Sequence, residues 1–352
     1  AWQTSTQMLG RSDIAGDAAA ELGVQYAVAG NIRVGGNQAR VSAQLISEAT
    51  REWVWADRFD FALNEAFAVQ DEIVARVLGA IDAGVRQAER EAARRRALDN
   101  LDVWGLCHRG MWHVFRFTRD DIASAEELFA RASKCAPRAA MPHAGLAYAA
   151  LVRALWHFTD DVPGAIQLGL QHADLAVSLD RSDANAHTVL GRLLTMRGEH
   201  ANGLQHLEIA IEINPSFAHA YYGLAQALHR DGQAAAALHN IERALLLSPK
   251  DPLLSMFLTL KALCHFTLGD LDAAESAARR ASGLQARETW SRLALATILQ
   301  LSGRSAEARA AIDEARAIQP GLSTATLAPL VENMAEEIKT RVMGALRASG
   351  LD

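Results

Sequence analysis

The stretch "HTVLGRLLTMRGEHANGLQHLEIAIEINP", residues 187–215, returns in altered form as "YYGLAQALHRDGQAAAALHNIERALLLSP", residues 221–249. The two stretches align without a gap at an offset of thirty-four residues. Small residues, a central glycine and a closing proline keep their places. The matched pairs are Leu190/Leu224, Gly191/Ala225, Leu194/Leu228, Gly198/Gly232, Gly203/Ala237, Leu207/Ile241, Ala210/Ala244 and Pro215/Pro249. Each copy therefore indicates two helices joined by a glycine turn and ended by a proline.

A period of thirty-four residues with this arrangement is typical of the tetratricopeptide repeat. The eighth and twentieth residues of such a unit face each other across its two antiparallel helices, so only Gly or Ala lets the backbones approach. Gly191 and Gly203 hold these positions in the first copy, and Ala225 and Ala237 hold them in the second. The sequence therefore predicts a mainly α fold, a tetratricopeptide-repeat superhelix.

The same pattern predicts about six helix pairs over residues 101–320, three of regular length and three stretched. Insertions are expected at "FRFTRDD", "HFTDDVPG" and "DPLLSM", and Pro320 closes the last unit. Residues 321–352 include "ENMAEEIKTRVMGAL", whose apolar side holds Ile338, Val342 and Leu346. We predict a C-terminal capping helix there, because the last unit of a stack needs a polar outer face.

The N-terminal part shows a period of two instead. The segments "YAVAGNIRV", "ARVSAQLI" and "EWVWADRFDF" alternate apolar and polar residues and are separated by turns, which predicts a three-stranded antiparallel meander. Residues 12–22 predict a short helix before it, and helical spacing begins near Glu65. We therefore expect a small α/β domain over residues 1–85 and a helical linker over residues 86–100.

Composition and charge narrow the possible partners. The net charge of -6 and the pI near 6.1 give no general attraction to nucleic-acid phosphates. One basic stripe is an exception to this acidic balance, but Glu89 and Glu91 lie among its arginines. We therefore favour a solvated helix face over a phosphate-binding surface there. No direct nucleic-acid binding is expected. The stripe comprises Arg86, Arg90, Arg94, Arg95 and Arg96.

Cysteines and apolar runs indicate the compartment. The three cysteines are widely spaced without a CxxC pair, which favours a reducing compartment over a disulfide framework or a zinc site. No apolar run approaches the roughly 18 to 20 residues that cross a bilayer. We therefore expect a cytoplasmic protein without a membrane segment. The chain begins at Ala1 rather than Met, which indicates processing or a piece of a longer protein.

Neither a catalytic centre nor a metal site is predicted. The histidines of the opening stretch, like His219, His229 and His239, fall at scattered phases of the repeat rather than at a metal-ligand spacing such as HxxxH. The sequence holds no GxxxxGK[ST], GxSxG or HExxH motif, so no phosphate loop, nucleophile elbow or zinc-protease helix is indicated. We expect no catalytic residue, no metal and no cofactor in this chain.

The first helix of each unit lines the inner side of such a superhelix. Its second, fifth, ninth, twelfth and thirteenth residues are our candidates for binding a peptide or a protein domain in the concave groove. Arg192 and Arg230 among them can pair with a carboxylate. The alternative is that these side chains form an ordinary solvated surface. The candidates are Asn185, Thr188, Arg192 and Thr195 in the third unit, and His219, Tyr222, Gln226, His229 and Arg230 in the fourth.

The order of segments also carries a resemblance. "AAELGVQYAVAGNIRVGGNQARVSAQLISEATREWVWADRFD", then "FAVQDEIVARVLGAI", then "LDVWGLCHRGMWHVFRFTRDDIASAEELFARA" and helical repeats resemble the C-terminal region of bacterial class III adenylate/guanylate cyclases. In that family a cyclase domain is followed by a TolB-N-terminal-like α/β domain and tetratricopeptide repeats. Similar tails follow winged-helix domains in transcriptional regulators.

The resemblance implies a non-catalytic regulatory and protein-interaction module of a bacterial signalling protein. The alternative is the sensor region of a transcriptional regulator whose DNA-binding domain lies outside this chain. The cyclase family's catalytic aspartates would lie before residue 1, and the first strand and helix of the TolB-like domain are missing. The α/β domain is therefore expected to be partial, with an unprotected sheet edge that pairs with another strand, including one from a second copy.

Overall fold

The computed structural model describes residues 24–284, 289–332 and 334–352, except for the side chains of residues 65–71. The helix predicted over residues 12–22 lies outside the described residues. The chain divides into two compact units, residues 1–92 and residues 93–352. The predicted boundaries at residues 85 and 100 stay a proposal, and the helix α3 (Ala66–Arg95) runs through much of the predicted linker.

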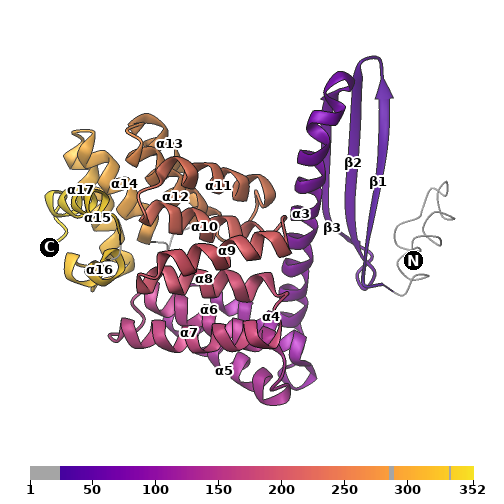
Figure 1. Ribbon diagram of the computed structural model, residues 1–352, viewed down its shortest axis with the longest axis horizontal. Coiled ribbons are helices and arrows are strands. Elements are labelled where there is room, and N and C mark those ends of the chain that lie inside the picture. Colours follow the sequence, from indigo (N-terminus) through magenta and orange to yellow (C-terminus); the bar gives the residue numbers. More distant parts are fainter. Residues whose placement is uncertain (1–23, 285–288, 333) are drawn as a thin grey trace. The chain divides into compact units, whose positions relative to one another are not determined.

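The first unit contains the predicted meander. Strands β1 (Tyr26–Gly35), β2 (Gln38–Ser47) and β3 (Trp53–Ala62) pair antiparallel in the order β1-β2-β3 (Figure 1). Gly36 has a φ of +60° in the turn between β1 and β2, a conformation that glycine adopts at little cost and that a two-residue hairpin requires. The expected three-stranded antiparallel sheet is confirmed.

The helix α3 covers part of one face of this sheet, after the short 3-10 turn η1 (Leu63–Glu65). A Cβ atom at Gly84 of α3 would lie 3.3 Å from side-chain atoms of both Leu45 and Val54, so the absence of a side chain lets helix and sheet approach. Leu45 and Phe59 are buried there. The close approach supplies an apolar core for a unit of few strands.

The second unit is the predicted superhelix, and after the 3-10 turn η2 (Leu98–Asn100) its described residues form six antiparallel helix pairs (Figure 1). Helices of one pair contact one another most closely, and consecutive pairs stack. The pairs are α4 (Val103–Val114) with α5 (Arg119–Cys135), α6 (Ala140–Leu155) with α7 (Val162–Leu179), α8 (Ala184–Arg197) with α9 (His200–Ile213), α10 (Ala218–Arg230) with α11 (Ala234–Leu247), α12 (Leu254–Thr267) with α13 (Leu271–Leu284), and α14 (Thr289–Leu301) with α15 (Ser305–Ile318).

The small residues lie where the period placed them. A Cβ atom at Gly191 would be 2.7 Å from the Gly203 carbonyl oxygen, and a Cβ atom at Gly203 would be 2.8 Å from the Gly191 oxygen. The backbones of α8 and α9 therefore touch at this crossing, which any side chain would hold apart. Gly198 has a φ of +95° and ends α8, so the predicted glycine turn is also present.

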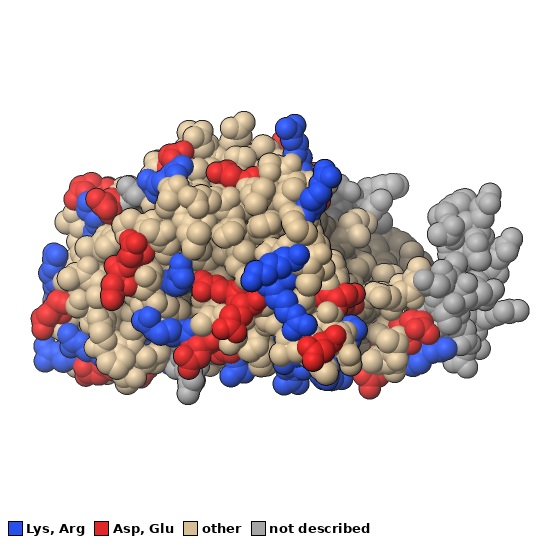
Figure 2. Space-filling view, turned by 90° about the horizontal axis from the view of Figure 1, so that it is seen from below, with Lys and Arg blue, Asp and Glu red and all other residues tan. Residues whose placement is uncertain are grey.

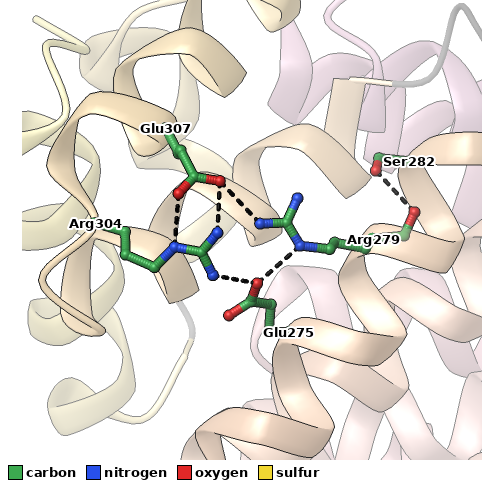
Figure 3. A network of polar contacts seen from close by, with 5 residues as sticks. All are labelled: Glu275, Arg279, Ser282, Arg304 and Glu307. Atoms are coloured by element: carbon green, nitrogen blue, oxygen red, sulfur yellow. Dashed lines mark hydrogen bonds and ion pairs between the residues drawn. The ribbon is translucent and has the colours of Figure 1, made fainter.

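A network of ion pairs connects the second helices of the last two units (Figure 3). Arg279 of α13 donates to Glu275 at 2.8 Å and to Glu307 of α15 at 3.0 Å, while Arg304 donates to both carboxylates. Hydrogen bonds from Arg279 and Arg304 hold the pKa of the Glu275 carboxyl below its usual value. Because the network lies at the surface, we expect it to order neighbouring helices more than to stabilise the fold.

The predicted cap consists of two helices, α16 (Thr324–Val331) and α17 (Glu336–Ala348). Met343 and Leu346 of α17 join the core that Leu293 and Ile312 form in the last unit. This burial covers the apolar side that the end of a stack otherwise exposes.

The end of α16 and the connection that follows it contact the fourth unit. Arg230 of α10 donates from Nη1 to the Leu330 carbonyl oxygen at 2.8 Å, and the Ala335 amide donates to the Arg230 carbonyl oxygen at 2.8 Å. The C-terminal segment therefore contacts the end of α10 as well as the last helix pair.

Candidate partner-binding wall

All nine candidate residues lie on α8 and α10, the first helices of the third and fourth units. We call the surface formed by α8 and α10, with the adjoining parts of α6 and α12, the inner wall. Five of the nine are buried and the others are partly exposed, which differs from the solvated-surface alternative. The buried ones are Thr188, Arg192, Thr195, Tyr222 and His229.

Arg192 lies between two aromatic rings from the neighbouring first helices. Its guanidinium carbon is 5.8 Å from the ring centre of Tyr148 on α6 and 5.2 Å from that of Tyr222 on α10. The Phe257 ring of α12 lies 4.9 Å beyond Tyr222. The side chain of Arg192 is 7% exposed, so its charge is held at a fixed place in the wall.

Hydrogen bonds also hold the guanidinium group of Arg192. Arg192 donates from Nε to Gln226 Oε1 at 3.0 Å, and Gln226 donates from Nε2 to the Tyr222 hydroxyl at 2.9 Å. The hydroxyls of Thr188 and Thr195 instead donate to carbonyl oxygens of their own helix. Arg192, Tyr222 and Gln226 therefore form one connected group, whereas the two threonines have structural partners.

A small pocket of about 20 Å³ opens beside this group. Arg192 and Arg230 both line it, and neither forms an ion pair with a carboxylate of the described residues. Burial, followed by the like charge of Arg192, lowers the pKa of Arg230 to about 10. The lining residues are Leu151, Leu155, Arg192, Thr195, Met196, Gly223, Gln226, Ala227 and Arg230.

The two candidate histidines have partners within the chain. His219 lies 3.0 Å from the carboxylate of buried Asp251, and its ring also packs against aromatic neighbours. The His229 ring nitrogen Nε2 lies 3.1 Å from the Thr267 hydroxyl oxygen, and burial lowers the pKa of His229 to about 4. His229 is therefore neutral at physiological pH.

Two further histidine pairs escaped the sequence analysis. The Nδ1 atoms of His143 and His172 lie 3.3 Å apart, and those of His187 and His206 lie 3.0 Å apart. Burial lowers the pKa of all four imidazoles. The signal was present, because His172 and His206 are thirty-four residues apart. No group of three or more His, Cys, Asp or Glu side chains in the described ranges lies close enough to share a metal ion.

The sequence analysis also missed Tyr148, which completes the support of Arg192. Tyr148 precedes Arg192 by forty-four residues, as Ala147 precedes Gly191. The insertion at "HFTDDVPG" lengthens this unit by ten residues, so the two side chains hold the same position of the repeat. A search that allowed for this insertion would have found Tyr148.

The buried thiols lack the character of nucleophiles. Burial raises the pKa of both Cys107 and Cys264 to about 12. A thiol with such a pKa carries almost no thiolate at neutral pH, and the thiolate is the reactive form.

Two arginines of the basic stripe bind partners that are near them in the sequence. Arg86 donates to Asp82 at 2.9 Å, and Arg96 donates to the Asn100 carbonyl oxygen. On the face drawn in Figure 2, described basic and acidic side chains are interspersed. Of the helices in the described ranges, none combines the length and the apolar composition needed to cross a lipid bilayer.

A family match and a solved structure with a TM-score above 0.5 agree with this fold. A family described as tetratricopeptide repeat matches residues 206–239. The structure of the APC/C hetero-tetramer Cut9-Hcn1 is similar with a TM-score of 0.53 and 15% identity over 77% of this chain and 49% of that one. A tetratricopeptide repeat protein from Parabacteroides merdae ATCC 43184 is 12% identical, with a TM-score of 0.47 over 81% of this chain and 97% of that one.

The chain thus has a tetratricopeptide-repeat superhelix, a fold suited to binding other proteins. Its sequence is also 28% identical over 175 residues to Putative adenylate cyclase 3 of Rhizobium meliloti (strain 1021). The matched part covers 50% of this chain and 30% of that protein, so the similarity spans less than a third of the relative's length.

Proposed function

We propose that this chain is a regulatory and protein-interaction region of a bacterial signalling protein, acting in the cytoplasm. It binds a peptide or a protein domain in the concave groove of its repeats and carries out no catalysis itself. The observation that carries the proposal is the polar group on the inner wall, where Arg192, Tyr222 and Gln226 are connected and oriented. Oriented polar groups beside apolar side chains are the usual means of specific recognition in a pocket.

The effector that this region serves is proposed to be an adenylate or guanylate cyclase domain. The similarity to a putative adenylate cyclase over half of the chain supports this assignment. The proposal includes a TolB-like identity for the α/β unit. We favour a cyclase over a transcriptional regulator with a winged-helix domain, because the similar protein is named as a putative adenylate cyclase.

Self-association through the sheet edge belongs to the same proposal. Within the described residues β1 has a neighbouring strand on one side only. Val28, Ile32 and Val34 of β1 are 53%, 70% and 63% exposed. An edge strand with free backbone groups and exposed apolar side chains is a template for another strand, and we propose that this is β1 of a second copy.

Site-specific photocrosslinking in the native bacterium tests the groove. A photoreactive amino acid at Asn185 on α8 should crosslink a protein partner, whereas the same amino acid at exposed Glu208 on α9 should not. Equal yields of the same partner at both positions would remove the groove assignment. Cyclic nucleotide formed by the purified chain would contradict the non-catalytic assignment.

A further inference from the structure

We infer that two pairs of histidines each bind a divalent transition-metal ion, and that Zn²⁺ is the ion that fits them best. The first pair is His143 on α6 with His172 on α7, and the second pair is His187 on α8 with His206 on α9. Each ion connects the two helices of one repeat unit. The inference goes beyond the proposed function, since it concerns the helix pairs themselves and not the partner in the groove.

The first support is the distance between the ring nitrogens. The Nδ1 atoms lie 3.3 Å apart in the first pair and 3.0 Å apart in the second. Two nitrogens bound to one tetrahedral Zn²⁺ at about 2.0 to 2.1 Å lie about 3.3 to 3.4 Å from one another. His172 and His206 are partly exposed, so a rotation of these rings can direct both nitrogens of a pair to one ion.

The second support is the orientation of the buried ring in the second pair. His187 Nε2 lies 3.2 Å from the Arg181 carbonyl oxygen. A carbonyl oxygen only accepts, so Nε2 carries the proton and Nδ1 of the neutral ring presents its lone pair. Metal-bound histidines usually hold their other ring nitrogen on a carbonyl or carboxylate oxygen in this way. His187 is therefore already oriented as a metal ligand.

The third support is that the first pair repeats this arrangement. A hydrogen bond to the backbone of Pro137 raises the pKa of His143, in opposition to burial, and the proline backbone offers only its carbonyl oxygen. Pro137 and His143 both precede their counterparts in the second pair by forty-four residues, and His172 precedes His206 by thirty-four. The same three groups therefore recur in consecutive units, as the repeat itself does.

The charges around the pairs also favour a cation. Burial lowers the pKa of all four imidazoles, so they are neutral at pH 7, the form that binds a metal. The Nδ1 proton of the partly exposed ring moves to its Nε2 through solvent when the ion binds. Asp174 opposes the effect of burial on the pKa of His206, and Asp180 and Asp183 oppose it on that of His187. Three carboxylates therefore lie near enough to the second pair to attract a cation.

Water completes the coordination of each ion. In the described ranges no group of three or more His, Cys, Asp or Glu side chains lies close enough to share a metal ion, so each pair supplies two ligands. Structural zinc sites have four protein ligands and catalytic ones have three. We therefore expect reversible binding that follows the concentration of free ion. Because each ion joins the first and second helices of its unit, the metal stabilises the folded superhelix.

The test uses ZnCl₂ as the probe and MgCl₂ as its control. The whole untagged chain, labelled with ¹⁵N in histidine, is titrated with each salt while the imidazole nitrogens are followed by NMR. We expect Zn²⁺ to shift the Nδ1 resonances of both pairs, with one ion bound per pair, and Mg²⁺ to shift none, because Mg²⁺ prefers oxygen ligands. The absence of a Zn²⁺-dependent shift at these imidazoles would overturn the inference, as would an equal response to Mg²⁺.

Variants assign the two sites. His172→Gln and His206→Gln should each weaken Zn²⁺ binding at their own pair about tenfold or more and leave the other pair unchanged. Both side chains are partly exposed, so the variants should fold, and circular dichroism in EDTA checks this. His239→Gln, at an exposed position of α11, is the matched control and should bind as the parent chain does. Unchanged Zn²⁺ binding in the double variant His172→Gln/His206→Gln would overturn the inference.

Thermal unfolding gives a second measurement. Zn²⁺ should raise the Tm of the parent chain, because a ligand that binds the folded state stabilises it, and should not raise the Tm of the double variant. Cys135 is exposed and a thiolate also binds zinc, so Cys135→Ser is tested beside it and should keep the full increase. An increase that persists in the double variant, or one that disappears with Cys135, would contradict the inference.

Discussion

The inner wall and the edge strand β1 are both unusual in which side chains they bury, and in opposite ways. The wall buries Arg192 at 7% exposure, whereas β1 leaves Ile32 70% exposed. Soluble domains usually hold charge at the surface and apolar side chains in the core. The wall therefore buries positive charge that no carboxylate of the described residues balances. The edge strand exposes apolar side chains and, among the described residues, has a paired strand on one side only. The two regions should accordingly bind partners of different chemistry.

The largest expected effect tests whether the wall is part of the core. Tyr222→Ala removes a ring that is 1% exposed and contacts Arg192 and Phe257. We expect it to lower the free energy of unfolding by about 3 to 5 kcal/mol, as for other buried aromatic residues. Urea unfolding measures the change. Tyr221→Ala is the control, since the neighbouring Tyr221 is only partly buried, and an equal loss there would contradict the distinction.

A pH titration tests the burial of His229, another residue of the inner wall. Its pKa is lowered to about 4 in the folded state from 6.5 in the unfolded chain, so between these values the unfolded state binds more protons. Stability is then complete above pH 6.5 and falls as the pH drops towards 4, by up to about 3 kcal/mol.

His229→Gln should remove that part of the pH dependence while keeping a polar group near Thr267. Unfolding curves at pH 7 and pH 4.5 compare the variant with the parent chain. If the variant loses as much stability between these pH values as the parent does, His229 is not the group responsible. The other buried histidines then account for the dependence.

Glycine at the helix crossing has a smaller expected effect. Gly191→Ala places a Cβ atom 2.7 Å from the Gly203 carbonyl oxygen, so α8 and α9 must move apart. We expect a loss of about 1 to 3 kcal/mol. Gly344→Ala in α17 is the matched control, because no atom lies within 4 Å of its added methyl group, and alanine there should be neutral or slightly stabilising.

The edge strand should show the smallest effect on stability and a clear effect on association. Ile32→Lys adds a charge where the side chain is already exposed, so the free energy of unfolding should change by only about 0.5 kcal/mol. Sedimentation analysis should show loss of self-association, because a lysine on an edge strand opposes pairing. Thr50→Lys, in the turn before β3, adds the same charge outside β1 and should leave association unchanged.

Much of the scaffold follows from sequence because its determinants repeat. Gly191 and Gly203 were assigned to a helix crossing from spacing alone, and the backbone contact between them confirms it. The meander followed from its period of two. The break between α16 and α17 was not predicted, because the apolar pattern of "ENMAEEIKTRVMGAL" continues the same face without indicating where the helix begins.

The candidate wall was predicted in part. Its nine residues were assigned by repeat position, and the structure places them on the two expected helices. Their burial was not predicted, because it depends on neighbouring helices. Tyr148 was missed because the insertion at "HFTDDVPG" changes its distance from Arg192 in the sequence. The histidine pairs were missed because each pair joins two different helices, and the two histidines hold different positions of the repeat.

The sequence by itself determined the repeating unit, the number of helix pairs and the residues at the crossings, since these depend on contacts within one period. Only the tertiary structure decided which buried charges have no opposite charge beside them among the described residues. Arg192 meets Gln226 thirty-four residues away, and Arg230 meets Leu330 one hundred residues away. Such contacts depend on how the units curve against one another, and no local pattern of residues encodes that curvature directly.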